Sequence, residues 1–417
     1  MNIDQVLKVF FISSIIILLI FFTLISSNKK FRDRVSIIKN NLVLTIYNKS
    51  KSHNEPDKIL EWQKPGYYKL FENSDIKEEK ELFTKFVISY QQGGSSYISL
   101  IDKKNKLIVN YEDLKDFLLI EYFDNKVLVF SNDNYLALYD LIEKEFILDK
   151  VMPVHHYGKI DINKEYLFFP DRQFIDLSKT KYLDGFKLHP SRECNVRAEN
   201  VIKIDLSNFD YETIIDSEKI YKQIGILKNR NLSCDDPFHL NDVRPIYNQS
   251  KNKIFSGKYP HFVLSYNFPS MIVIVEAITS KVKGYFVDMG FLNQHSPRIY
   301  KNNMILFDNL GNIKNQYGRS RILLIDLNSN KMKTLLESSK NFSFFSVNRS
   351  LVDYQVDKNL NKIHLIVTSS AQGLFFTFNC DIPKFENCSF PKYILRKNDE
   401  NLFNISIDSL FNAKIIE

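Results

Sequence analysis

The chain has 417 residues, 44% of them hydrophobic and 25% charged, a composition typical of a globular protein able to bury a large core. A net charge of +7 is small for this length, and no long Lys/Arg block or module motif is present, which argues against a nucleic-acid partner. Aromatic residues make up 14% of the chain, led by Phe and Tyr, and this favours strands over helices.

An uncharged stretch rich in Ile, Leu and Phe occupies residues 9–27. At about 1.5 Å per residue, a helix of this length can cross the hydrocarbon core of a membrane. The residues that follow, Asn28, Lys29 and Lys30, do not resemble the small-residue cleavage site of a signal peptide. We therefore expect residues 1–30 to form an uncleaved transmembrane anchor, with a cleaved signal peptide as the alternative.

The charges that flank the anchor and the cysteine content indicate opposite sides of the membrane for the main domain. Lys29, Lys30, Arg32 and Arg34 follow the anchor and only Lys8 precedes it, which by the positive-inside rule places the main domain in the cytoplasm. Long domains, however, translocate largely regardless of charge. An even number of cysteines behind a membrane segment fits an oxidising compartment. We expect the main domain on the extracytoplasmic, periplasmic side.

The four cysteines are Cys194, Cys234, Cys380 and Cys388. No CxxC pair is present, which disfavours a zinc site. Cys380 and Cys388 are near enough in sequence to close a small loop, and Cys194 and Cys234 could form a second bridge. Four unpaired thiols are the alternative.

Residues 31–80 are polar and mixed, and we interpret them as a stalk. From residue 81 onward, short runs of four to eight strand-forming residues alternate with clusters of Asn, Asp, Gly and Lys, and long helical periodicity is absent. This pattern predicts an all-β domain over residues 81–417, of sandwich, barrel or propeller type.

A repeated unit favours the propeller. An apolar pair, an acidic residue, a short polar turn and a Lys-flanked strand recur along the domain. The acidic residues of the copies are Asp102, Asp140, Asp176, Asp205, Glu276 and Asp326. A series of hairpins at roughly blade length is typical of a β-propeller. Six copies predict about six blades, although the interval from Asp205 to Glu276 is too long for one blade.

Unusual polar groups gather in four segments of this domain. The segments are His155-His156, residues 235–243 with His239 and Asn241, Ser256-Gly257-Lys258, and Asn293-Gln294-His295. Segments that enter successive blades face the centre of a propeller, so we expect these groups to meet there. Imidazoles with Lys and Asn could hold a divalent metal. They could equally hold a sulfate- or phosphate-like anion and attack it through a histidine nucleophile. The alternative for any single histidine is a structural, hydrogen-bonded role.

These segments resemble the arylsulfotransferase β-propeller family of secreted and periplasmic bacterial proteins. The resemblance covers roughly residues 151–373 and rests on the combination and order of five pieces. They are His155-His156, residues 236–243 (Asp-Pro-Phe-His-Leu-Asn-Asp-Val), residues 290–295 with Asn-Gln-His, Leu306-Phe307-Asp308-Asn309, and Ser320-Arg321. The resemblance implies a six-bladed propeller with a central site. It also implies transfer of a sulfuryl group from an aryl sulfate to a phenol, without a nucleotide cofactor and through a sulfated histidine.

The resemblance also assigns roles to the histidines. His295 matches the nucleophile. His156 and His239, with His155 as a neighbour, match the groups that hold sulfate oxygens and exchange protons with the leaving phenol. Carboxylates near these histidines are few, which disfavours a hard-metal site, and the family reaction requires no metal.

Asn241 matches a supporting hydrogen-bond donor, and we assign Lys258 and Arg321 to substrate binding. Two positions depart from the family. Lys258 stands where an arginine is usual, which keeps the charge but loses the planar fork that clamps two oxygens. Ser296 replaces the acidic residue that usually follows the nucleophile, which affects the tautomer or basicity of the imidazole.

The sequence therefore predicts a membrane-anchored propeller whose small-molecule substrates are an aryl sulfate and a phenol. Two other functions stay open. One is a propeller that binds a sulfated or phenolic ligand, or a partner protein, without turnover, which the departures at Lys258 and Ser296 would fit. The other is a metal-dependent hydrolase.

Overall fold

The structure of the chain is a computed structural model. It describes residues 85–92, 95–102, 107–131, 135–154, 156, 158–171, 173–176, 187–188, 195–224, 231–232, 239–247, 253–267, 270–287, 289–315, 317–340, 342–346, 350–370, 374–395 and 409–416. The predicted anchor and stalk, His155, Cys194 and Cys234 lie outside these ranges. Within the described ranges, no helix is long and apolar enough to span a membrane.

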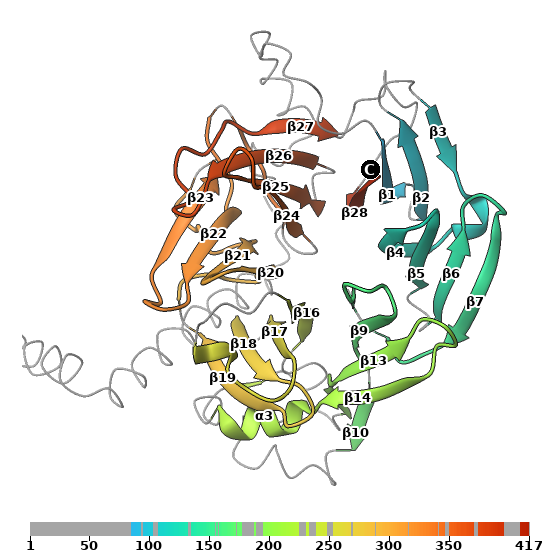
Figure 1. The fold of residues 1–417 in the computed structure, drawn as a ribbon, viewed down its shortest axis with the longest axis horizontal. Coiled ribbons are helices and arrows are strands. Elements are labelled where there is room, and N and C mark those ends of the chain that lie inside the picture. The colour runs from blue at the N-terminus through green and yellow to red at the C-terminus, as the bar shows by residue number, and fades with distance from the viewer. Residues whose placement is uncertain are drawn as a thin grey trace, which may run out of the picture.

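The described residues form an all-β, six-bladed propeller, as the repeat predicts (Figure 1). Each blade is a four-stranded antiparallel sheet, whose strands we name from the innermost outward. Blade 1 comprises β28 (Ser409–Ile416), β1 (Lys85–Gln92), β2 (Ser95–Asp102) and β3 (Leu107–Asn110). Blade 2 comprises β4 (Phe117–Phe123), β5 (Lys126–Ser131), β6 (Tyr135–Asp140) and β7 (Glu145–Val151). Blade 3 comprises β8 (Lys159–Ile160), β9 (Tyr166–Pro170), β13 (Val201–Asp205) and β14 (Tyr211–Ile215).

The other three blades follow in order along the chain. Blade 4 comprises β16 (Leu240–Ile246), β17 (His261–Tyr266), β18 (Met271–Glu276) and β19 (Lys281–Phe286). Blade 5 comprises β20 (His295–Tyr300), β21 (Asn303–Asp308), β22 (Arg321–Asp326) and β23 (Met332–Glu337). Blade 6 comprises β24 (Leu351–Asp357), β25 (Lys362–Ser369), β26 (Leu374–Asp381) and β27 (Lys392–Leu395).

The ring is closed by pairing the two ends of the propeller. The last strand, β28, lies antiparallel beside β1 in blade 1, with Lys85 opposite Ile416. Because the closing strand comes from the other end of the chain, blade 1 couples the first and last parts of the domain. Backbone groups of β1 that would otherwise face the axis unpaired are hydrogen-bonded in this way.

The core consists of apolar layers between neighbouring blades. All six residues of β17 and all six of β18 are buried, because both faces of blade 4 pack against other blades. One layer joins Ile305 and Phe307 of blade 5 to Leu365 and Phe376 of blade 6. At the rim this packing ends, and β23 has no buried residue. Continuous apolar runs therefore mark the middle strands of a blade, and mixed runs mark its rim.

The repeated acidic residue marks the end of the third strand of a blade. It does so in blades 1 to 5, at Asp102, Asp140, Asp205, Glu276 and Asp326. At Asp140, Asp205 and Asp326 the carboxylate accepts hydrogen bonds from the backbone of the turn that follows. Asp326 Oδ1, for example, accepts hydrogen bonds from the backbone N–H of Asn328 and Ser329 at 2.9 and 2.7 Å, and these bonds lower the pKa of Asp326.

One copy of the repeat was misassigned. Residues 174–176 belong to β10 (Gln173–Asp176), which pairs with β12 (Asn195–Ala198) in a small separate sheet. Blade 6 instead ends its third strand at Asp381, after Asn379 and Cys380, where the apolar pair is missing. The predicted number of six blades is confirmed, although the copy at Asp176 does not belong to a blade.

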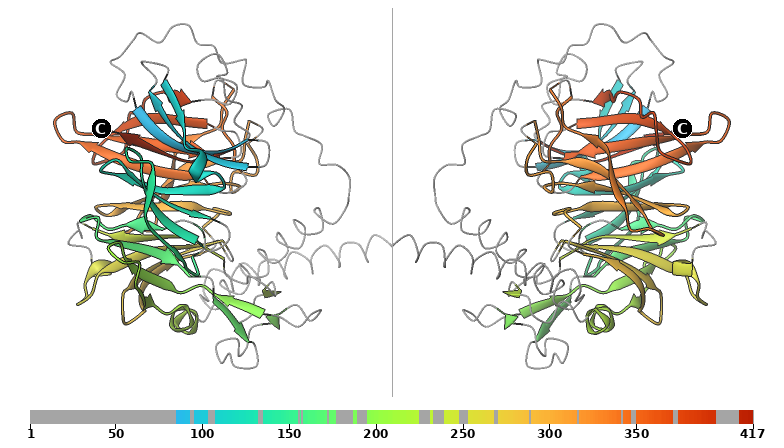
Figure 2. Two further views of the ribbon diagram at one scale, coloured as in Figure 1. Left: turned by 90° about the vertical axis from the view of Figure 1, so that its right-hand side faces the viewer. Right: turned by 90° about the vertical axis from the view of Figure 1, so that its left-hand side faces the viewer.

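Insertions around blade 3 explain the long interval from Asp205 to Glu276. Helix α3 (Ser217–Gln223) follows β14, and its first turn is capped by Asp216, whose carboxylate accepts hydrogen bonds from the N–H groups of Glu218 and Lys219. The short strands β11 (Lys187–Leu188) and β15 (Asn231–Leu232) pair in parallel. Figure 2 shows the small sheets extending from the body of the propeller.

The spacing of Cys380 and Cys388 fits the disulfide that the structure contains. The bond links β26 to the turn before β27 in blade 6. The backbone of this turn is further joined by the N–H of Asp381, which donates to the carbonyl of Glu386 at 2.8 Å. The disulfide therefore fastens the outer part of the last full blade.

Candidate active site on the propeller axis

Three histidines lie at the same end of the propeller because they precede or begin the innermost strands of consecutive blades. His156 lies three residues before β8, His239 directly before β16, and His295 is the first residue of β20. Each innermost strand starts at this end, and β16 contacts β20. We refer to His156, His239 and His295 as the histidine cluster.

The rings of His156 and His239 are in contact. Their centroids are 4.3 Å apart and the rings are steeply inclined to each other, at 63°. Both residues have left-handed backbones, with φ of 63° and 50°. Non-glycine residues rarely adopt this conformation, and such strain concentrates at functional sites. Gly158 permits the close approach of the His156 segment, since a Cβ at this position would lie 2.2 Å from the ring of Phe169.

The hydrogen bonds of His295 define its tautomer. Nδ1 lies 3.0 Å from the carbonyl oxygen of Asn293 and 3.0 Å from Oδ1 of Asn309. The Asn309 amide is itself oriented, because its Nδ2 donates to the carbonyl of Ser346 at 3.0 Å. Both neighbours of Nδ1 are acceptors, so the proton resides on Nδ1 and the lone pair on Nε2.

Burial keeps His295 neutral. The residue is 4% exposed, and this burial lowers its pKa to about 4 despite the opposing effects of Asn293, Asn309 and Asp242. The nearby His239 lowers the pKa further. At pH 7 His295 is thus an uncharged imidazole with its lone pair on Nε2, the form of the ring that a histidine nucleophile needs.

Asn241 and Gln294 hold the two central segments together. Asn241 Nδ2 donates to the carbonyl of Gln294 at 3.1 Å, and Gln294 Nε2 donates to the carbonyls of Tyr266 and Met271 at 2.9 and 3.1 Å. Asn241 is 1% exposed, and its Oδ1 accepts no hydrogen bond from the described residues. This oxygen is a buried acceptor beside the histidine cluster, suited to a donor on a bound molecule.

Two buried acids lie behind His239. The carboxylate of Glu199 accepts a hydrogen bond from the backbone N–H of Leu240, the residue after His239. Asp171 accepts from the N–H of Asn200 at 2.9 Å. Burial raises the pKa of Asp171 to about 7, with the charge of Glu199 acting in the same direction. The contact with Leu240 fixes the backbone that positions His239.

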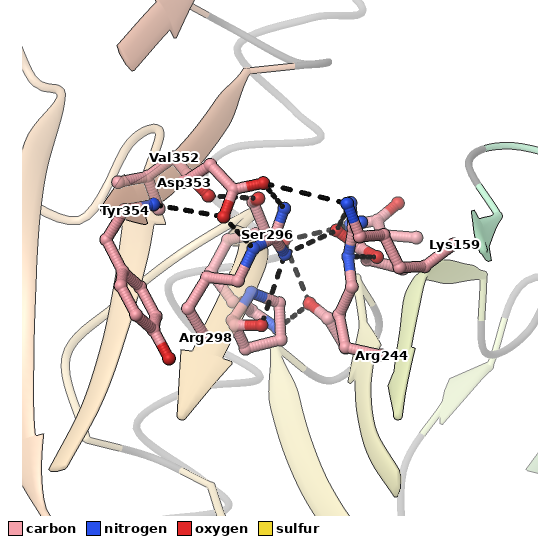
Figure 3. Close-up of polar contacts among 12 residues, drawn as sticks. Lys159, Arg244, Ser296, Arg298, Val352, Asp353 and Tyr354 are labelled. Carbon is pink, nitrogen blue, oxygen red and sulfur yellow. Dashed lines mark hydrogen bonds and ion pairs between the residues drawn. The ribbon is translucent and has the colours of Figure 1, made fainter. Parts of the chain in front are cut away.

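A network of charged side chains crosses the propeller axis, contributed by the innermost strands of blades 2 to 6 (Figure 3). We call this set the ion network, and its members are Glu121, Lys159, Asp242, Arg244, Arg298 and Asp353. Lys159 Nζ lies 2.7 Å from Glu121 Oε2 and 3.9 Å from Asp353 Oδ2. Lys159 and Asp353 come from blades 3 and 6, which face each other across a six-membered ring. Side chains therefore fill the axis at this level.

The most deeply buried part of the ion network is its centre. Arg244 pairs with Asp242, with Nη2 donating to Oδ2 at 2.9 Å, and Arg298 Nη1 lies 4.0 Å from the same oxygen. Arg298 also holds Asp353 through Nε and Nη2, at 3.1 and 3.3 Å. With three acids and three bases, the network is balanced in charge. It lies below the histidine cluster, and Asp242 is near enough for its charge to raise the pKa of His295.

The remaining sequence-predicted residues lie elsewhere or serve the scaffold. Lys258 precedes β17, whose start pairs with the end of β16, so it lies at the opposite end of blade 4 from His239. Its side chain is exposed, with Nζ 5.3 Å from the ring of Tyr259. Arg321 lies at the histidine end, but its guanidinium binds Asp308 Oδ2 at 2.7 Å and the carbonyl of Gly290 at 2.8 Å. The structure thus brings together His156, His239, Asn241 and His295, and not Lys258.

Ser296 also serves the scaffold. Its hydroxyl donates to the carbonyl of Val352 at 2.8 Å, so it joins blade 5 to blade 6 and leaves the orientation of His295 to Asn309. Among the described residues, no group of three or more His, Cys, Asp and Glu side chains is arranged to hold a metal ion.

Sequence reasoning missed the role of Asn309 and the whole ion network. Asn309 lies in one of the motifs on which the family resemblance rests, but its position in the sequence did not indicate a functional role. Asp242 and Arg244 carried a usable signal, since residues two apart on a strand share one face. Lys159, Arg298 and Asp353 stand in ordinary strand patterns, and nothing local distinguishes them.

Comparisons with known proteins leave the family open. No family model matches the chain. No curated protein matches it either. Among solved structures, the chain is similar to the dihydro-heme d1 dehydrogenase NirN in complex with DHE, at 8% identity and a TM-score of 0.35. The similarity covers 81% of this chain and 57% of that one, so the chain spans little more than half of the NirN chain. This level of similarity carries no argument about function.

Proposed function

We propose that the chain transfers a sulfuryl group from an aryl sulfate to a phenol, with His295 as the nucleophile. The observation that carries this proposal is the state of His295. Asn293 and Asn309 hold its Nδ1–H, and burial keeps the ring neutral at pH 7. An imidazole held in this tautomer presents the lone pair of Nε2 in a fixed direction, and no metal or redox partner is needed for the attack.

In the first half of the reaction, Nε2 attacks the sulfur of the aryl sulfate. An N–S bond forms, the S–O(aryl) bond breaks, and the phenolate leaves with the bonding electron pair. Protonated His156 or His239 gives a proton to the departing oxygen. The rings of these two histidines contact each other, with centroids 4.3 Å apart, and their N–H groups would also bind sulfuryl oxygens.

In the second half, the oxygen of the acceptor phenol attacks sulfur and the N–S bond breaks, which restores neutral His295. The histidine that gave its proton to the first phenolate now takes one from the acceptor. Oδ1 of Asn241, a buried acceptor without a partner among the described residues, is suited to receive the acceptor's O–H hydrogen bond. Atoms and charge balance over the two steps, so a cofactor is not part of the proposal.

Binding without turnover is the second candidate, and one observation favours it. The two guanidinium groups below the histidine cluster, Arg244 and Arg298, are engaged by Asp242 and Asp353, and Lys258 lies at the far end of the blade. A cation that is already paired stabilises a developing negative charge less well. In that case the cluster would bind a sulfated or phenolic ligand through hydrogen bonds alone.

Turnover of a chromogenic aryl sulfate separates the two candidates. We expect release of phenolate that depends on an added phenol acceptor. Because Lys258 lies outside the histidine cluster, Lys258→Ala should leave the rate within about twofold of the unmodified protein. Absence of release with any of several acceptors, from protein whose folding is confirmed, would favour binding. A large loss of rate in Lys258→Ala would contradict the assignment of the site to the histidine end.

A further inference from the structure

A cavity of about 490 Å³ opens at the end of the propeller opposite the histidine cluster. It is formed where innermost strands of blades 4, 5 and 6 end, since Tyr247 follows β16, Tyr300 ends β20 and Lys358 follows β24. The volume lies within the range of small-molecule sites. We call this cavity the distal pocket, and the ion network separates it from the histidine cluster.

Tyrosines form the walls of the distal pocket. The rings of Tyr300 and Tyr354 meet edge-on, with centroids 5.7 Å apart at 75°. Tyr354 is locked in place by its hydroxyl, which donates to the carbonyl of Ile299 at 2.7 Å. Tyr247 hydrogen-bonds the backbone of Ile162. Fixed aromatic faces with polar edges suit a flat or chair-shaped ring that carries hydroxyl groups.

Two lysines give the distal pocket a positive charge. Lys301 and Lys358 line it, both are exposed, and neither forms an ion pair with any described residue. Asp357 is adjacent in sequence, but its Oδ1 accepts hydrogen bonds from the N–H groups of Asn359 and Leu360 at 2.9 and 3.0 Å. Positive charge that no acid of the pocket pairs with is complementary to an anionic ligand.

We propose that the distal pocket binds an acidic saccharide, a pyranose unit that carries a carboxylate or a sulfate. The tyrosine rings would pack against the faces of the sugar, and Lys301 and Lys358 would bind its acidic group. The amide of Asn361, at the rim, adds a donor and an acceptor for hydroxyl groups. A simple aryl acid would use the rings and the lysines and would leave these polar groups without partners. This proposal does not depend on sulfuryl transfer.

The test is calorimetric titration of the full-length protein with trigalacturonate. Its methyl ester has the same rings without the charges, and we expect it to bind at least roughly tenfold more weakly, as a lost charge-assisted contact requires. The variant Lys301→Gln/Lys358→Gln should show a similar loss for trigalacturonate. Lys144→Gln, an exposed lysine in the turn between β6 and β7 of blade 2, should bind as the unmodified protein does.

Two further titrations test where the ligand binds and which of its chemical groups are recognised. His295→Asn should leave trigalacturonate binding unchanged, because the ion network lies between the two sites. Benzoate, which has a ring and a charge without sugar hydroxyls, should bind more weakly than trigalacturonate. The proposal would be overturned if trigalacturonate did not bind measurably, if its methyl ester bound equally well, or if benzoate bound more tightly. It would also be overturned if the double lysine variant bound as the unmodified protein does, or if His295→Asn lost binding.

Discussion

Replacing His295 with asparagine is expected to reduce acceptor-dependent cleavage of an aryl sulfate by at least about a thousandfold, because a group that forms the covalent intermediate cannot be bypassed. Asparagine is small enough for the buried site and keeps a polar group near Asn309. The matched control is His364→Asn, since His364 lies in β25 of blade 6, away from the cluster. Cleavage by His295→Asn at a rate near that of the control would move the chemistry to another residue.

The acidity of His295 gives the same prediction a pH dependence. The neutral imidazole is the reactive form, and its pKa is about 4 in the folded protein against an ordinary value near 6.5. The rate should therefore persist as the pH falls from 7 to 5 and be lost as it falls through about 4. The free energy of unfolding should also fall as the pH falls between these two pKa values. In that range the unfolded state binds more protons than the folded state. An acid limb centred near 6.5 would contradict a buried, neutral His295.

The second large effect concerns the centre of the ion network. Asp242→Leu removes the carboxylate that Arg244 and Arg298 share, and it leaves Arg244, which is 5% exposed, without its partner. We expect the free energy of unfolding to fall by about 3–5 kcal/mol, the cost of an uncompensated buried charge. Chemical denaturation followed by fluorescence measures this loss.

A double substitution tests whether charge, and not volume, is responsible. Asp242→Leu/Arg244→Met removes both members of the pair, and it should recover a substantial part of the lost stability. The matched surface pair is Lys150 and Asp210, 3.2 Å apart and largely exposed, for which Asp210→Leu should cost less than about 1 kcal/mol. If the double variant were as unstable as Asp242→Leu, the network would not be held by charge pairing.

The blades could be predicted from sequence because their signals are local. An apolar run such as residues 304–307 is bounded by turn residues, and an acid such as Asp326 closes its turn through contacts two and three residues away. The same locality explains the error at Asp176, which has the right pattern at the end of a strand that pairs with β12, outside the blades. Local chemistry shows that a strand forms and where it ends, and it does not show which strand pairs with it.

The site was predictable only in part, because its contacts join distant segments. The histidines stand out as titratable groups ahead of strands, and the structure brings three of them together. Lys258 looked equally suitable. His239, however, precedes the innermost strand of blade 4 and Lys258 follows it, so the length of that strand separates the two residues. The pairing of Lys159 with Asp353 depends on two blades facing each other across the axis, which no pattern in either segment reports.

Direct detection of a sulfated histidine would test the central claim. The full-length protein would be mixed with an aryl sulfate in the absence of a phenol, quenched within the first turnover, digested and analysed by mass spectrometry. The account predicts one added SO₃ group on the peptide that contains His295, and its loss when a phenol is supplied before the quench. Release of phenolate without any modified histidine, or modification of another residue in its place, would contradict it.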